Sequence, residues 1–371
     1  MVQKDIAVLY GDGIGPEIMA EARKVLDVVA DEYGHNFIYH EADFGGVAYD
    51  NCGHPFPQET IEICDKADAI LKGPIGGPKY DKISDPSLRP EAGALLPLRK
   101  RYDTFANYRP LRLTSALVSS SPLKPEIIGD GIDILMIREL TGGIYFGEKI
   151  ENDINLKGEL FARDVMEYTE PQVERISRVA FSEARSRKKK KVFNIHKANV
   201  LATSRFWNKI VDRVHAEEFP DIELEHQLVD SAAFSLVVSP KKFDQSVMLF
   251  ENMMGDIITD QGGGILGSLG LMPSACIGPK KGYYEPAHGS APDIAGKGVA
   301  NPYSMIGSAA YMLEKGFGLK EESLKVSDAL DAVFGAGYRT KELATQFTPS
   351  DKILSTKQFG DKVTSFLIGE N

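Results

Sequence analysis

The amino-acid sequence predicts an α/β protein built around a largely parallel sheet. Short apolar segments of strand-like composition alternate with longer amphipathic segments of helical periodicity, which is the pattern of βαβ units. The 371 residues exceed the usual size of a single hydrophobic core, so we expect two lobes. With 43% hydrophobic and 26% charged residues, the composition is ordinary for a globular enzyme.

The chain opens with a strand, a glycine-rich turn and a helix. The strand is expected over residues 6–10 and the helix over 17–31, with Pro16 near its start and one apolar face. Further strands are expected at 69–71, 132–137, 192–195, 224–229 and 247–250, and further helices at 172–187, 200–218 and 300–315. Residues 142–168 are polar with period-two character and a turn-like Lys157-Gly158, which predicts a protruding β-hairpin, or arm.

The net charge of −10 argues against a protein that binds nucleic acid regardless of sequence, because such binding needs a basic surface. A basic run at residues 185–191 admits a nuclear or nucleic-acid interpretation. We favour the alternative, a solvated helix end, where cations suit the helix dipole.

Cysteine usage and hydropathy predict a cytoplasmic protein. The three cysteines are odd in number and have no CxxC spacing, which disfavours a disulfide framework and a structural zinc site. We expect no signal peptide, because the first strand lacks a preceding charged and apolar leader. We also expect no membrane partner, since no apolar run is long enough to span a bilayer.

The first glycine-rich turn contains Gly11, Gly13 and Gly15, between a strand and a helix where a dinucleotide fingerprint would lie. The spacing is GxGxG rather than GxGxxG, and Glu41 and Asp43 lie further on than a ribose-binding acid should. Two interpretations stay open: a nucleotide site and a tight strand-to-helix turn.

Three arginines and a tyrosine are candidates for binding and converting a small anionic acid. Arg99, Arg109 and Arg138 each lie at a strand end or in a loop, and such a set can hold a dicarboxylate at both ends. Tyr145 follows Arg138 in a glycine-rich turn and can transfer a proton to a carbanion or enolate. The alternative for any single arginine is a surface salt bridge.

Carboxylates and a lysine further along the chain suggest metal-assisted chemistry. Asp256 and Asp260 are four residues apart and would share a helix face, where a cation would relieve their repulsion. Asp230, which we place at a strand end, could complete an oxygen shell suited to Mg²⁺ or Mn²⁺. Lys197 directly follows a strand and could assist as a general base. The alternatives are helix-end acids and a solvated lysine.

Residues 285–296 form a long Gly/Pro-rich segment before a helix, and loops of this kind in compact domains are often functional. Asp293 could accept hydrogen bonds from a ribose diol and would repel a 2′-phosphate, which favours NAD over NADP. The alternative is an ordinary connecting loop.

Together these segments resemble the β-decarboxylating dehydrogenases, the isocitrate/isopropylmalate dehydrogenase family, over nearly the whole chain. Residues 141–147, Thr-Gly-Gly-Ile-Tyr-Phe-Gly, match the isopropylmalate branch, and so does the segment 91–99. In that branch the residues matching Glu91, Leu95 and Leu96 border the isopropyl group of the substrate. A third carboxylate, as in isocitrate, would meet the leucines without a partner and lose its solvation.

The resemblance implies a two-lobed fold that is not the Rossmann fold. The first lobe would comprise residues 1–104 and 267–371, and the second residues 105–266. The arm would belong to the interface of a homodimer with shared active sites, because Lys197 and Asp230 match positions that the neighbouring subunit supplies in the family.

The resemblance also implies NAD-dependent oxidation of 3-isopropylmalate at its hydroxyl carbon, followed by loss of CO₂, in leucine biosynthesis. Lys197 and Asp230 would assist removal of the hydroxyl proton, and Tyr145 would protonate the enolate. One Mg²⁺ or Mn²⁺ per active site would bind Asp230, Asp256 and Asp260. The implied substrate contacts are Arg99, Arg109, Arg138, Glu91, Leu95, Leu96, Val200 and Asp230, and the implied NAD contacts are Ile14, His288, Gly289, Ser290, Ala291, Pro292, Asp293, Ile294 and Asn301.

Other functions are compatible with parts of this pattern. A related enzyme could act on D-malate or tartrate, homoisocitrate or isocitrate, and Glu91, Leu95, Leu96 and residues 141–143 discriminate against these. A catalytically silent regulatory subunit would keep the fold but lose Lys197, Tyr145 or a metal-binding aspartate, and none is lost here. A nucleic-acid-binding module is disfavoured by the net charge.

Overall fold

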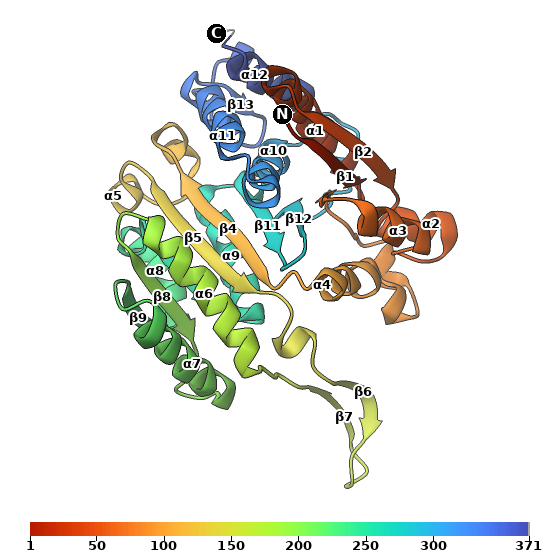
Figure 1. The fold of residues 1–371 in the computed structure, drawn as a ribbon, viewed down its shortest axis with the longest axis vertical. Coiled ribbons are helices and arrows are strands. Elements are labelled where there is room, and N and C mark those ends of the chain that lie inside the picture. The colour runs from red at the N-terminus through yellow and green to blue at the C-terminus, as the bar shows by residue number, and fades with distance from the viewer. Residues whose placement is uncertain (370–371) are drawn as a thin grey trace.

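The computed structural model describes residues 1–369, which form a mixed α/β structure around one ten-stranded sheet (Figure 1). The strands are β1 Gln3–Leu9, β2 Asn36–Ala42, β3 Ala69–Lys72, β4 Ala106–Leu113, β5 Ile132–Glu139, β6 Lys149–Ile154, β7 Leu160–Asp164, β8 Lys191–His196, β9 Glu223–Leu228, β10 Val247–Phe250, β11 Pro273–Ile277, β12 Gly282–Pro286, β13 Arg339–Thr340 and β14 Ile353–Leu354. The helices are α1 Gly15–Tyr33, α2 Gly46–Cys52, α3 Gln58–Lys66, α4 Leu96–Tyr102, α5 Pro125–Ile128, α6 Glu170–Ser186, α7 Ala202–Glu218, α8 Val229–Val238, α9 Asn252–Leu266, α10 Tyr303–Tyr311, α11 Lys320–Gly335 and α12 Thr356–Leu367.

The large sheet has the order β2-β1-β3-β12-β11-β4-β5-β10-β8-β9. The outer strands run parallel to their neighbours. The three central pairs, β12–β11, β11–β4 and β4–β5, are antiparallel. Strands β4 and β11 meet over only three residue pairs, while β4 and β5 pair over eight. The α/β fold class with a largely parallel sheet is confirmed, and the antiparallel centre is an addition to it.

The strands of the large sheet divide by their position in the chain. The five on the β2 side come from residues before 73 or after 272, and the five on the β9 side come from residues 106–250. On the β9 side, α6 and α7 cover one face and α8 and α9 the other (Figure 1). Lobe boundaries at 104/105 and 266/267 stay a prediction.

Helix α1 shows how local sequence sets an element. It begins at Gly15 with Pro16 in its first turn, where a missing backbone N–H costs nothing. Its buried positions recur at helical spacing, from Ile18 to Val29. It ends before Gly34, whose φ of 66° is the left-handed conformation that glycine adopts at low cost. The predicted helix at 17–31 is therefore correct but short by two residues at each end.

Strands β6 and β7 pair antiparallel in a separate two-stranded sheet that extends away from the body of the molecule (Figure 1). The predicted hairpin is confirmed, but its strands lie within residues 149–164 rather than over the whole of 142–168. Ile154, Leu156 and Leu160 are exposed on it, although large apolar side chains usually lie inside.

Several sequence-based boundaries were incomplete. β2, β4, β11 and β12 were not predicted. Asp230 was placed at a strand end, but β9 stops at Leu228 and Asp230 lies in the first turn of α8, where its charge suits the helix dipole. The basic run begins at the end of α6, where Arg185 pairs with Asp221 and Arg187 pairs with Asp133, which fits the helix-end interpretation. Within residues 1–369, no helix is both long and apolar enough to cross a membrane.

Candidate active site

A cavity of about 370 Å³ lies where the ends of β3, β5 and β12 meet α4 and α9. The carboxyl ends of parallel strands are the usual place for ligands in α/β sheets. The side chains around it include both apolar and charged groups. Its lining residues are Lys72, Pro74, Ile75, Glu91, Leu95, Leu96, Arg99, Arg109, Arg138, Tyr145, Lys149, Asp256, Glu285, Pro286, Ala287, His288 and Gly289.

The three predicted arginines converge on this cavity, and all three are buried. Arg99 donates from Nε to the hydroxyl of Tyr283 over 2.9 Å. Arg109 donates from one Nη to Thr259 at 2.8 Å and to Asp260 at 2.9 Å. Guanidinium donors held in this way are preorganised for a carboxylate ligand.

Of the three arginines, Arg138 donates the most hydrogen bonds to neighbouring residues. Its Nε and one Nη donate to the backbone and side-chain oxygens of Asn252, each over 2.8 Å. Its other Nη donates to Asp256 Oδ1 over 2.6 Å. Burial lowers the pKa of Arg138 to about 10, so the guanidinium stays charged at neutral pH.

Tyr145 donates its hydroxyl to Asp256 Oδ2 over 2.8 Å, and its ring centroid lies 5.9 Å from the Arg138 guanidinium carbon. Burial, reinforced by the Asp256 charge, raises the pKa of Tyr145 to about 12. The phenol therefore keeps its proton at neutral pH, as a general acid must.

The structure brings together part of the predicted metal site. Asp256 and Asp260 lie one turn apart on α9, beside Arg138 and Arg109. Asp230 instead pairs with Lys197, whose Nζ donates to Asp230 Oδ1 over 2.8 Å. No group of three or more His, Cys, Asp and Glu side chains within residues 1–369 is placed to hold a metal ion. A single chain therefore supplies two of the three predicted ligands together.

The predicted apolar wall is also only partly assembled. Leu95 and Leu96 line the cavity with Glu91, in a π-turn that continues into α4, and such turns are often found at functional sites. Glu91 approaches the backbone closely at Gly76, where an added Cβ would lie 2.0 Å from Glu91 Oε1. Val200 is not among the lining residues and is 64% exposed.

The first glycine-rich turn packs against the loop that follows β12. The Ile14 N–H donates to the Ser290 carbonyl oxygen over 2.8 Å. Gly13 has φ 58°, and an added Cβ would lie 1.9 Å from that same oxygen. The sequence around Gly13 therefore makes a tight turn with close backbone approach, which places Ile14 beside the loop predicted to bind NAD.

The residues predicted to bind NAD are spread along that loop. His288 and Gly289 line the cavity, and the buried Ser290 hydroxyl donates to the Gly76 carbonyl over 2.6 Å. His288 Nε2 is buried without a hydrogen-bond partner, and burial lowers the pKa of this ring, which keeps it neutral. An orphaned polar atom at a cavity wall fits a bound polar ligand.

The rest of the loop continues away from the cavity. Pro292 and Asp293 are exposed, Ala291 and Ile294 are half-buried, and Ala291 has a left-handed φ of 39°. Asn301 is buried and donates to Glu342 Oε1 over 3.0 Å. The carboxylate of Asp293 is exposed, and its contact with a ribose diol stays a prediction.

Sequence reasoning missed a buried ion pair in the cavity wall. Lys72 Nζ lies 2.5 Å from Glu285 Oε2, and the two residues are 1% and 8% exposed. A single lysine at the end of an apolar strand carries no local signal, because its partner lies far away along the chain. Burial would raise the pKa of Glu285, but Lys72 and Arg99 together hold it below its ordinary value.

Two further polar residues that hold the backbone of the site were missed. Asp12 accepts from the backbone N–H groups of Gly46, Val47 and Gly76 at 2.7–2.8 Å. Glu139, fully buried beside Arg138, accepts from the turn that leads to Tyr145. Glu139 could have been suspected, because a charged residue within a strand must find a partner.

Comparisons with known proteins agree over nearly the whole chain. Residues 5–363 match the family described as Isocitrate/isopropylmalate dehydrogenase. The 3-isopropylmalate dehydrogenase of Halalkalibacterium halodurans is 48% identical, covering 98% of this chain and 97% of the relative. The enzymes of that name from Syntrophotalea carbinolica and Bacillus subtilis are 49% and 46% identical, covering 98% and 100% of this chain and 98% and 99% of the relatives.

Solved structures show the same architecture. Isocitrate dehydrogenase from Methylococcus capsulatus has a TM-score of 0.83 at 30% identity, with 98% of this chain and 99% of that chain covered. A beta-decarboxylating dehydrogenase from Thermococcus kodakarensis has a TM-score of 0.77 at 30% identity, with 98% and 96% covered. These similarities and the arginine-lined cavity lead to one conclusion: the chain belongs to the isocitrate/isopropylmalate dehydrogenase family.

Proposed function

We propose that this enzyme catalyses NAD-dependent oxidative decarboxylation of 3-isopropylmalate to 4-methyl-2-oxopentanoate in leucine biosynthesis. The observation that carries this proposal is the convergence of three buried arginines beside two leucines in one cavity. Arginines suit the two carboxylates of the substrate, and leucines suit its isopropyl group. Relatives named for this activity match over nearly the full chain.

The donor set fits a divalent cation that is completed by a second subunit. Asp256 and Asp260 would hold Mg²⁺ or Mn²⁺ together with Asp230 of the partner subunit, an all-oxygen set that these ions prefer. Bound there, the cation would polarise the substrate hydroxyl and stabilise developing negative charge. Bound NAD would accept the hydride, and the unpartnered Nε2 of His288 and the exposed Asp293 carboxylate fit contacts to it.

The residues of the protein then perform binding and proton transfer. Arg99, Arg109 and Arg138 orient the carboxylates, and Leu95 and Leu96 exclude water around the isopropyl group. The Lys197–Asp230 pair assists loss of the hydroxyl proton, and Tyr145 delivers its proton to the enolate left after CO₂ departs.

A homodimer follows from this assignment. Lys197 and Asp230 lie outside the cavity of their own chain, and Val200 is exposed beside them, so these residues serve a neighbouring active site. Helices α8 and α9 expose Phe234, Val237, Val238 and Ile257, an apolar surface that a partner would cover. The lobe division at 104/105 and 266/267 and a cytoplasmic location complete the proposal.

A related dehydrogenase activity on another hydroxy acid is the second candidate. None of the alternative acids has an apolar branch to contact Leu95 and Leu96. In isocitrate and homoisocitrate, the third carboxylate would lie unsolvated against these leucines. The apolar wall therefore favours 3-isopropylmalate. A silent regulatory subunit is disfavoured because Tyr145, Lys197 and all three aspartates are present.

The test is NADH formation with Mg²⁺ and matched concentrations of 3-isopropylmalate, isocitrate, homoisocitrate and D-malate. NADP⁺ in place of NAD⁺ and an EDTA control complete the design. We expect dominant turnover of 3-isopropylmalate with NAD⁺, abolished by chelation and restored by added Mg²⁺ or Mn²⁺. Preference for another acid would contradict the substrate assignment, and absence of any turnover by a folded sample would contradict enzyme function.

A further inference from the structure

A chain of buried hydrogen bonds supports the turn that carries Tyr145. Glu139 is fully buried at the end of β5 and has no direct ion-pair partner among the described residues. Its Oε1 accepts from the Thr141 backbone N–H at 2.8 Å and from the Thr141 hydroxyl at 2.7 Å. Its Oε2 accepts from the Gly142 N–H at 2.8 Å. The carboxylate thus fixes the first two residues of the turn.

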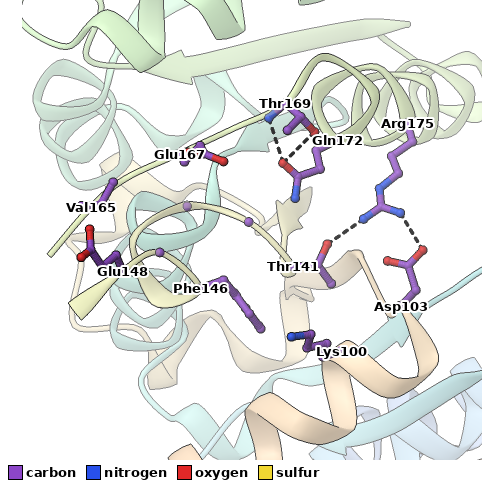
Figure 2. A pocket seen from close by; sticks show the side chains of 13 residues that line it. Lys100, Asp103, Thr141, Phe146, Glu148, Val165, Glu167, Thr169, Gln172 and Arg175 are labelled. Atoms are coloured by element: carbon purple, nitrogen blue, oxygen red, sulfur yellow. Dashed lines mark hydrogen bonds and ion pairs between the residues drawn. The ribbon is translucent and has the colours of Figure 1, made fainter.

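Thr141 also faces a guanidinium. Arg175 donates from one Nη to the Thr141 hydroxyl oxygen and from the other to Asp103 Oδ2, each over 2.7 Å (Figure 2). The single hydroxyl therefore accepts from Arg175 and donates to Glu139. The hydroxyl thus links the buried Glu139 carboxylate to the Arg175 guanidinium, with which Glu139 makes no direct hydrogen bond. The link is stabilising because an uncompensated buried carboxylate is costly.

The link joins two parts of the active site. Asp103 directly follows α4, the helix that carries Arg99, and Thr141 leads through the short 3-10 turn Gly143–Tyr145 to the proton donor. The other side of the turn is fixed by Asn252, whose Nδ2 donates to the Gly142 carbonyl at 2.9 Å. Asn252 also accepts from Arg138, so one frame positions both the arginine and the tyrosine.

We propose that Thr141 is a positioning residue for Tyr145, acting by joining the Glu139 carboxylate to the Arg175–Asp103 ion pair. This inference rests on the proposed function. In the step that it supports, the Tyr145 O–H bond breaks as a C–H bond forms on the enolate carbon, and the phenolate then takes a proton from solvent. Loss of the Thr141 hydroxyl breaks the link between Glu139 and Arg175 and leaves the turn with only its backbone hydrogen bonds to Glu139 and Asn252, so Tyr145 is positioned less firmly. The three substrate-binding arginines keep their own contacts.

Thr141 borders a cavity, so its side chain can be substituted without a steric clash. Thr141, Asp103 and Arg175 border a cavity of about 540 Å³, separate from the substrate cavity (Figure 2). Thr141→Val keeps the branched shape of the side chain but replaces the hydroxyl with a methyl group, next to space that already exists. Thr141→Ser keeps the hydroxyl. Thr364→Val, on α12, replaces a half-buried hydroxyl whose one hydrogen bond within residues 1–369 is to the Asp361 carbonyl, and it is the matched control.

The experiment compares these variants with the wild-type enzyme as assembled with Mg²⁺, NAD⁺ and 3-isopropylmalate. For T141V we expect kcat to fall by about tenfold to a hundredfold, as for an impaired general acid. The KM for 3-isopropylmalate should stay within about threefold, because binding contacts are retained. T141S should recover most of kcat, and T364V should match the wild type.

A pre-steady-state measurement separates positioning from general destabilisation. Hydride transfer precedes protonation by Tyr145, so T141V should release a burst of about one NADH per active site before slow turnover. Its solvent deuterium effect on kcat should exceed that of the wild type, since proton delivery becomes limiting. Arg175→Met, which leaves the Thr141 hydroxyl in place, should lower kcat in the same way and serves if T141V does not fold.

The outcomes are distinguishable. Wild-type kcat in folded T141V, or a T141S variant as slow as T141V, overturns the positioning role. A raised KM with unchanged kcat also overturns it and assigns Thr141 to substrate binding. A wild-type enzyme that fails to turn over 3-isopropylmalate overturns the proposed function instead.

Discussion

Lys72 ends strand β3 with its ammonium buried against Glu285 in the wall of the active-site cavity. Both side chains are buried in this wall, and each charge depends on the other. Lys72 and, after it, Arg99 favour the charged form of Glu285. Removing one partner of such a pair leaves a buried charge uncompensated, which costs more than the intact pair contributes. At the scale of single residues, this pair is therefore expected to be sensitive to substitution of either partner.

Lys72→Met is expected to lower the free energy of unfolding by about 3–5 kcal/mol at pH 7. In the wild type, the depressed pKa of Glu285 contributes stability above the ordinary glutamate range, and this is lost as pH falls through the folded-state pKa. Without Lys72 the pKa of Glu285 rises, so protonation of Glu285 at lower pH removes the uncompensated charge and recovers part of the variant's lost stability. Urea unfolding from pH 7 to pH 4 should therefore show the largest wild-type advantage at pH 7.

Lys79→Met is the matched control, because Lys79 forms an exposed pair with Asp50. It should change stability by less than about 1 kcal/mol at every pH. A Lys72→Met variant as stable as this control would contradict the role assigned to the buried pair.

At the scale of elements, α8 and α9 present apolar side chains to solvent on the face of the sheet opposite α6 and α7. Phe234 is 67% exposed on α8, and Ile257 is 63% exposed on α9. Helices of a globular protein normally turn such residues inward. The same two helices carry Asp230, Asp256 and Asp260, so covering this surface and completing the metal site are one event in the proposed dimer.

Phe234→Glu should place a charge in that interface and shift the protein from dimer to monomer in sedimentation velocity, with loss of turnover. Leu324→Glu is the control, since Leu324 is 61% exposed on α11, away from α8 and α9. It should sediment and turn over like the wild type. A dimeric and active Phe234→Glu variant would exclude this surface as the interface.

How far the sequence predicts the site differs from element to element. Arg138, Tyr145 and the α9 carboxylates are predictable because they lie at or after a recognisable strand or share one helix face. Arg99 and Arg109 were expected at a strand end or in a loop, but Arg99 lies within α4 and Arg109 within β4. Lys72 and Glu285, and likewise Thr141 and Arg175, are remote in sequence, and neither periodicity nor spacing encodes their contacts. β4, β11 and β12 escaped prediction because each contains a proline, and β4 also two arginines, which weaken the local strand signal.

At the scale of the whole molecule, the active site proposed here is complete only across two chains. Tyr145 and the arginines line one chain's cavity, whereas Lys197 and Asp230 lie outside it. Lys197→Ala and Tyr145→Phe should each be nearly inactive as homodimers. A mixed dimer would contain one site with both substitutions and one intact site.

Co-refolding equal amounts of the two variants should therefore restore roughly a quarter of wild-type activity, because half of the randomly paired dimers are mixed. Turnover per milligram is the measurement, with each variant refolded alone as the control. Activity that stays at the level of the separate variants would show that each chain carries its own complete site.

The position of β12 in the sheet has a consequence for how the chain folds during translation. Strand β3 pairs on one edge with β1, but its other edge pairs with β12 at Ile70 and Leu71. During translation, β3 leaves the ribosome long before Gly282–Pro286, whereas β4, β5, β8, β9 and β10 are all made in one continuous stretch. The continuous half can therefore condense first, while β3 keeps an unpaired apolar edge of the kind that nucleates aggregation. Slow elongation between these segments, or scarce chaperone, should lower the yield of this enzyme without changing the stability of the finished fold.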